Sequence, residues 1–106
     1  MIALIVRFTV LPDHLDAFDA LVSDAMEQID LHEPGTLVYL NHQRADNPDE
    51  RVFYECYQSE EAIQAHEDQD YIKKFLDDLR KHLAQAPEVW RMNTLEGLIR
   101  GEAPAR

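Results

Sequence analysis

The segment Ile2–Val10 is apolar on both of its alternating faces. Its β-branched and aromatic residues favour a strand. Every even-numbered residue from Ile2 to Val10 is apolar, and Ala3 and Ile5 are apolar on the other face. A strand of this kind is usually covered on both sides. Because 106 residues leave room for only one domain, we expect a single sheet that buries both of its faces.

The rest of the chain predicts an alternation of helices and strands. Apolar residues at helical spacing indicate the helices, and runs with strand propensity indicate the strands. Pro, Gly and Asp separate these segments and mark their boundaries. The expected elements are a strand at 2–10, a helix at 15–31 capped by Asp13, strands at 36–44 and 51–57 joined by a loop at 45–50, a short helix capped by Ser59, a helix at 71–84, and a strand at 88–95.

The order β-α-β-β-α-β predicts a ferredoxin-like α+β fold, with a four-stranded antiparallel sheet and its helices on one face. The domain is expected to span 1–96, and 97–106 to form a C-terminal tail or dimer arm. The uncovered face would expose Ile5 and Leu40, and monomers rarely tolerate a large apolar patch. We therefore expect a homodimer whose sheets pack face to face or close into a barrel.

Charge and cysteine content exclude several classes of protein. The formal net charge of −11 weighs against nucleic acid and anionic membranes as partners, since these bind clustered Lys and Arg. A single cysteine, Cys56, allows no intrachain disulfide and is expected to be an inert buried thiol. No run reaches the length of a membrane span, and no basic segment precedes the first apolar run. A cytoplasmic location is expected.

Several motifs resemble those of the antibiotic biosynthesis monooxygenase family, whose members form dimeric α+β barrels. The resemblance covers about residues 2 to 96. The segments that carry it are Pro12-Asp13, Glu33-Pro34-Gly35-Thr36, Phe53-Tyr54-Glu55-Cys56-Tyr57, Ser59-Glu60-Glu61-Ala62-Ile63-Gln64-Ala65-His66 and Lys73-Lys74-Phe75.

The resemblance implies several possible reactions. The family includes cofactor-free oxygenases of phenols or quinols, haem-degrading enzymes and an isomerase of a phosphorylated sugar. Three haem-pocket positions of the family align with Val6, His66 and Leu76, and a Leu cannot ligate iron. The chain has no Gly-rich loop for a phosphate. The resemblance therefore leaves one interpretation, an oxygenase that uses O₂ without a cofactor. Such an enzyme needs a shielded pocket and a base.

His66 and Glu55 are the candidate catalytic residues. His66 lies on the apolar face of its short helix and could act as a general base on a phenol. Alternatively, it hydrogen-bonds the loop at 68–70 or the sheet and only fixes the helix. Glu55 lies within an apolar strand and therefore needs a partner. It could orient His66, but an ion pair with Arg7 or Arg91 is the favoured expectation.

The expected substrate-binding residues come from strands far apart in the sequence. Tyr57, Tyr39 and Trp90 are candidate pocket walls, although an ordinary core is the favoured expectation for each of them. Asn41 could donate to a substrate oxygen or lie at an exposed edge, and Arg91 could meet an anionic group. The histidines lack metal-binding spacing, so no metal is expected.

The functional hypothesis is therefore a small cofactor-independent monooxygenase that acts on a phenolic or quinol-type molecule. Two alternatives stay open. One is an isomerase or other proton-transfer enzyme on the same scaffold. The other is a non-catalytic dimer that binds a small molecule, for example in a stress response.

Overall fold

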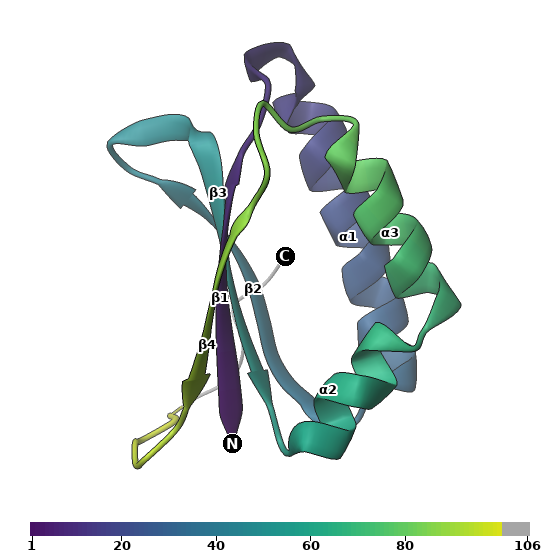
Figure 1. The fold of residues 1–106 in the computed structure, drawn as a ribbon, viewed down its shortest axis with the longest axis vertical. Helices are drawn as coiled ribbons and strands as arrows, with labels where there is room; N and C mark the ends of the chain where they lie inside the picture. Colours follow the sequence, from purple (N-terminus) through teal and green to yellow (C-terminus); the bar gives the residue numbers. More distant parts are fainter. Residues whose placement is uncertain (101–106) are drawn as a thin grey trace.

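The computed structural model describes residues 1–100 and shows one sheet with its helices on one side (Figure 1). Residues 94–100 form neither helix nor strand, and the rest of the predicted tail, 101–106, lies outside the described residues. In chain order the elements are β1 (Ile2–Thr9), the short 3₁₀ turn η1 (Pro12–His14), α1 (Leu15–His32), β2 (Thr36–Arg44), β3 (Asn47–Tyr57), α2 (Glu60–Glu67), α3 (Asp70–Arg80) and β4 (Glu88–Asn93).

The four strands form an antiparallel sheet in the order β2-β3-β1-β4. The two central strands, β1 and β3, are therefore paired on both sides, whereas β2 and β4 are the edges. The helices lie together against one face of the sheet (Figure 1). This arrangement confirms the predicted ferredoxin-like α+β fold.

The core lies between the sheet and the helices. Val6, Phe8 and Phe53 project from the two central strands and pack against Phe18 of α1 and Phe75 of α3. All five are buried, with exposed fractions of 8% or less. Full burial of such a side chain is worth roughly 1.5–3 kcal/mol, so this layer contributes much of the stability.

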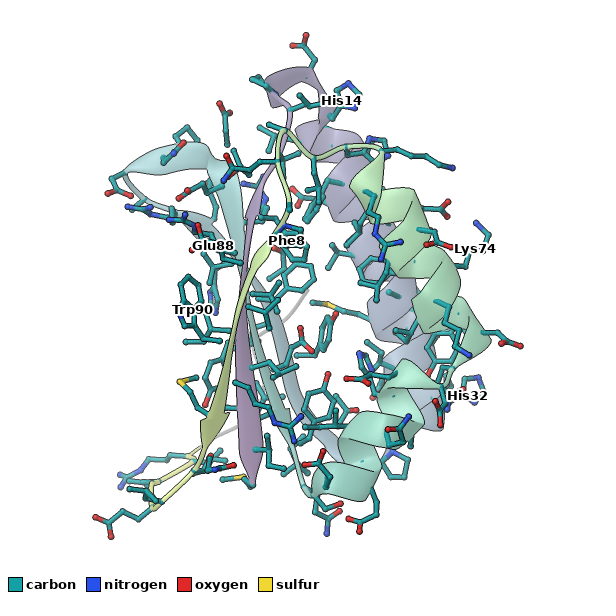
Figure 2. All side chains as sticks on the ribbon, viewed as in Figure 1. Phe8, His14, His32, Lys74, Glu88 and Trp90 are labelled. Carbon is teal, nitrogen blue, oxygen red and sulfur yellow. The ribbon has the colours of Figure 1, made fainter. Side chains whose placement is uncertain are left out.

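Among residues 1–100, no helix lies over the opposite face of the sheet (Figure 1). Ile5 lies at the centre of this face, opposite Tyr54 of β3 on one side and Trp90 of β4 on the other. Tyr54 is 37% exposed and Trp90 is 47% exposed. Figure 2 shows Trp90 on the side of the sheet away from the helices, whereas Phe8 points towards them. We call this surface the open face.

Two predicted boundaries are wrong because tertiary pairing extends or replaces local structure. The loop expected at 45–50 is much shorter, because Asn47 already pairs with Arg44 and β3 begins there. The helix expected to reach residue 84 ends at Arg80. Leu83 instead forms an isolated bridge with Val10, and Ala84 N–H donates to the carbonyl of Thr9 at 2.9 Å.

The predicted caps have different outcomes. Ser59 caps α2 as expected, since its side chain accepts a hydrogen bond from the N–H of Ala62 at 3.2 Å. Asp13 does not cap α1. It lies inside the 3₁₀ turn, so His14 occupies the cap position and makes no side-chain capping bond.

Gly35 is the residue at which the α1–β2 connection passes closest to α2. A Cβ added to Gly35 would lie 2.7 Å from the Cβ of Ala62. The carbonyl of Gly35 also accepts a hydrogen bond from the N–H of Gln58 at 2.9 Å, which limits movement away from the helix. Only glycine fits this approach without displacing the helix or the turn.

We therefore expect Gly35→Ala to lower the free energy of unfolding by about 1–3 kcal/mol, the usual cost of overpacking. Urea denaturation measures the change. The matched control is Gly97→Ala, because a Cβ there meets nothing within 4 Å. Equal midpoints for the wild type and the Gly35→Ala variant would show that the contact with Ala62 is not tight.

Candidate functional site

A cavity of about 250 Å³ lies between the helix-facing side of the sheet and the helices α2 and α3. We call it the inner pocket. Most of its wall is apolar, and its polar groups include Glu55 from β3 and His66 from α2. The apolar side chains come from three strands, from α3 and from the segment after it: Leu4, Val6, Phe8, Phe53, Ile72, Leu76, Leu79, Leu83, Pro87 and Val89. An apolar cavity with a few convergent polar groups is typical of a small-molecule site.

His66 is held firmly at this wall. It is buried, with an exposed fraction of 7%. Its Nδ1 lies 2.6 Å from Oε1 of Glu33, which follows α1. Its ring also packs against the rings of Tyr39 and Tyr57, with centroid distances of 5.7 and 5.3 Å.

The surroundings of Glu33 determine which nitrogen of His66 carries the proton. Oε1 of Glu33 also accepts from the hydroxyl of Thr36 at 2.8 Å, and Oε2 accepts from the hydroxyl of Tyr71. Burial and proximity to Glu33 raise the pKa of the Tyr71 hydroxyl, so it stays a donor. A carboxylate with these partners acts as an acceptor, and Nδ1 of His66 therefore donates to it. In the neutral ring, Nε2 is then free to accept a proton.

Glu55 forms a second buried acid within the same wall. The hydroxyl of Tyr57 donates to Oε1 of Glu55, and both residues are buried. Burial raises the pKa of Glu55 to about 7, and the negative charges of Glu33 and Glu67 add to the rise. Burial and the adjacent Glu55 also raise the pKa of Tyr57, which remains a neutral donor. Glu55 therefore exchanges its proton near neutral pH.

The expected partners of these two residues are wrong. The imidazole of His66 pairs with Glu33, and not with Glu55 or the loop at 68–70, although the backbone carbonyl of His66 accepts from the N–H of Gln69 at 3.3 Å. Glu55 pairs with Tyr57 instead of an arginine. The two arginines contact other acids: Arg7 contacts the exposed Glu88 and the buried Glu50, and Arg91 contacts the exposed Glu60. Strand register explains why Glu55 does not pair with Arg7, because Glu55 lies on the helix-facing side and Arg7 faces the other way. Arg91 lies on the same side as Glu55, but β1 separates their strands, and Arg91 contacts Glu60 of α2 instead.

The predicted binding residues occupy different places. Tyr39 lines the inner pocket, and Tyr57 lies beside it as the partner of Glu55. Trp90 lies on the open face, across the sheet from the pocket, because its register places it opposite Ile5. Asn41 lines a different groove, between α1 and β2, and its Nδ2 donates to Asp19 at 3.1 Å. Arg91 is bound to Glu60, as described above.

Sequence reasoning missed Glu33 and Tyr71 as parts of the site. Glu33 lies 33 residues before His66, and no motif connects the two. The local signals were an acidic residue directly before Pro34-Gly35, where the sequence indicated a helix end, and its place in one of the segments that resemble the family. The chain brings the two side chains together only when α1 and α2 both pack on the sheet.

The raised pKa of Glu55 predicts a specific dependence of stability on pH. The pKa of Glu55 in the folded state, about 7, exceeds the reference value of 4.5. Between pH 4.5 and pH 7 the folded state therefore binds this proton more tightly than the unfolded state does. The stability contributed by protonated Glu55 is complete below pH 4.5 and is lost as the pH rises towards 7. Relative to the Glu55→Gln variant, the wild type should lose about 3 kcal/mol between pH 4 and pH 8.

Urea denaturation of both proteins at pH 4, 5.5 and 8 measures this difference. The Glu55→Gln variant keeps an acceptor for Tyr57 but cannot ionise, so it is the matched control. A constant difference in unfolding free energy across the three pH values would contradict a raised pKa at Glu55.

The fold and chain length agree with those of several solved proteins. A proposed antibiotic biosynthesis monooxygenase from Caulobacter crescentus superposes with a TM-score of 0.86 at 24% identity, over 90% of each chain. One from Nitrosomonas europaea gives 0.83 at 26%, over 91% of this chain and all of that one. A protein from Mycobacterium tuberculosis gives 0.80 at 28%, over 91% and 96%. A search of curated proteins found no match.

A comparison of the sequence with family models points to the same group of proteins as the solved structures. The model of the family described as antibiotic biosynthesis monooxygenase matches residues 1–78, about three quarters of the chain, from β1 to the second half of α3. This match includes Glu33, Glu55 and His66. The chain therefore belongs to the antibiotic biosynthesis monooxygenase family.

Proposed function

We propose that this protein is a cofactor-independent monooxygenase that acts on a small phenolic or quinol-type molecule in the inner pocket. The observation that carries the proposal is the position of His66. It lies in the wall of an apolar cavity, and its Nδ1 is bound to a buried carboxylate at 2.6 Å. A histidine oriented in this way by an acid is suited to remove a proton from a bound hydroxyl.

In the proposed reaction, Nε2 of His66 takes the phenol proton and leaves an electron-rich phenolate. The phenolate transfers one electron to O₂, and the resulting superoxide and phenoxyl radical combine at a ring carbon to form a hydroperoxide. Loss of that carbon's hydrogen as a proton, with cleavage of the O–O bond, gives a quinone and water. One phenol and one O₂ thus yield one quinone and one H₂O. The electrons come from the substrate, so no cofactor is required.

The pocket supplies the other conditions for this chemistry. Its apolar wall excludes water from the reactive intermediates, and its volume of about 250 Å³ favours a small aromatic compound. Glu55, with its pKa near 7, can hold the proton that the departing hydroxide needs to form water. We propose Glu33 as the residue that positions His66, and Tyr39 as a wall for the substrate ring.

Oxygen uptake with a panel of quinols and dihydroxynaphthalenes tests this function. We expect one O₂ consumed per quinone formed in the wild type. The His66→Gln variant should reduce kcat by roughly 10²–10⁴-fold, the usual contribution of a general base. The control is His42→Gln, an exposed histidine of β2 that lies opposite Val52 of β3, whose kcat should be unchanged.

Three results would contradict the proposal in different ways. Substrate turnover without oxygen uptake would favour the isomerase or proton-transfer alternative, which can use the same two residues, His66 and Glu55. Binding of a quinol without any turnover would favour the non-catalytic alternative. Full activity of the His66→Gln variant would remove His66 as the base.

We also propose that the protein acts as a homodimer through its open face. The support is the partly exposed apolar surface formed by Ile5, Tyr54, Trp90 and Met92, which no helix covers. A second copy can bury this surface on both subunits at once through a two-fold axis. The sheets would then be covered on both faces.

Sedimentation at micromolar concentration should therefore show a dimer for the wild type. The double variant Tyr54→Glu with Trp90→Glu should sediment as a monomer, because it would place four buried charges in the interface. The control is Leu31→Glu, which changes an exposed leucine on α1 and should remain dimeric. A wild-type monomer would refute the dimer.

A further inference from the structure

The charged residues of the inner pocket are divided between its two ends. His66 and Glu67 are the last two residues of α2, and both line the pocket. Glu55 lies at the same end, because its partner Tyr57 packs against the ring of His66. Arg80, the last residue of α3, also lines the pocket. Among the described residues of this wall, Arg80 is the one with a permanent positive charge.

The helix α3 sets the distance between Arg80 and the acids. It begins at Asp70, just after α2, and runs away from α2 along the pocket (Figure 1). Ile72, Leu76 and Leu79 of this helix form part of the apolar wall. At a rise of 1.5 Å per residue, Ile72 and Arg80 are about 12 Å apart along the helix axis. Arg80 therefore lies at the end of the pocket away from His66.

The exposed residues of the wall show where the pocket opens. Leu76 of α3 is 40% exposed and Val89 of β4 is 58% exposed, so the mouth lies between this helix and the edge strand. The side chain of Arg80 is 68% exposed although it lines the pocket. Its aliphatic stem can cover the wall while its guanidinium stays in water at the mouth.

The guanidinium of Arg80 can bind a second carboxylate. Its Nη1 donates to Asp77 at 2.5 Å. Asp77 lies three residues earlier on α3 and its side chain is 70% exposed, and exposed pairs of this kind contribute little to stability. A guanidinium has five N–H donors in a planar fork that matches a carboxylate. A ligand can therefore bind Arg80 without breaking a strong native contact.

The acids at the α2 end disfavour an anionic group beside His66. Such a group would meet Glu55 and Glu67, with the carboxylate of Glu33 directly behind the imidazole. Repulsion between like charges would expel it from this end, whereas Arg80 would attract it at the other end. A phenolic hydroxyl is a donor and suits Nε2 of His66. The charges of the pocket therefore favour one orientation of a molecule that has both groups.

We propose that the substrate of the inner pocket is an aromatic hydroxy acid, a bicyclic phenol or quinol that carries a carboxylate, and that Arg80 binds this carboxylate at the mouth. The inference rests on the proposed function and names the substrate class of the same pocket. Two fused rings span more of the 12 Å between Ile72 and Arg80 than one ring does. Arg80 is a specificity-determining residue, because it selects the charge of the substrate and takes no part in the reaction.

Binding measured under argon tests the inference without oxidation of the ligand. The probes are 5,8-dihydroxy-2-naphthoate and its carboxamide, which have the same rings but differ in the charge at one end. Isothermal titration calorimetry of the wild type should give a Kd for the acid about three- to tenfold lower than for the amide. The factor is modest because Arg80 is partly exposed to water.

Three variants assign this preference to its source. Arg80→Gln should bind the acid and the amide equally, and Arg80→Lys should keep a preference for the acid because it keeps the charge. The matched control is Lys74→Gln, which removes the same charge from an exposed position on α3 outside the pocket wall and should keep the wild-type preference. A wild type that does not prefer the acid would overturn the inference. An Arg80→Gln variant with the wild-type preference would overturn it too.

Oxygen uptake with the same two compounds separates this inference from the proposed function. If the amide binds and is oxidised as well as the acid, the anionic substrate class fails and the monooxygenase stands. If the acid binds through Arg80 without oxygen uptake, the binding inference stands and the monooxygenase fails. If neither compound binds, the substrate class is overturned, and the panel of other quinols decides the proposed function separately.

Discussion

The structure depends on a sheet with two apolar faces and helices for only one of them. The central strands send Val6, Phe8 and Phe53 into a closed core beneath the helices, while Ile5 projects to the open face. The buried layer stabilises the subunit. The uncovered layer costs free energy until another surface removes it from water, and this imbalance is the physical argument for a second copy.

The candidate site uses the same core, and its polar groups are two hydrogen-bonded sets around Glu33 and Glu55. Glu33, His66 and Tyr71 form one connected group, and Glu55 with Tyr57 forms another, at the wall of a largely apolar pocket. A buried carboxylate is costly unless hydrogen bonds satisfy it, and here the donors come from α2, α3 and neighbouring strands. The site therefore exists only when these elements are packed together, and its two acids are held in different environments.

The predictions from sequence succeeded where the signal was local. Hydrophobic periodicity identified the helices and strands, Ser59 marked the start of α2, and the element order gave the sheet arrangement. The errors arose where pairing between distant segments replaced local preference. Leu83 left the expected helix to pair with Val10, and residues 47–50 joined β3 because β2 and β1 offered partners.

The sequence by itself determined the family, the fold and the two residues at the inner pocket, because these follow from short motifs and from the spacing of apolar residues. Only the tertiary structure decided the partners of those two residues. The face on which a strand side chain lies is set by register, which separated Trp90 from the pocket. The contact between Glu33 and His66 joins the end of one helix to another across 33 residues, a distance that no local pattern encodes.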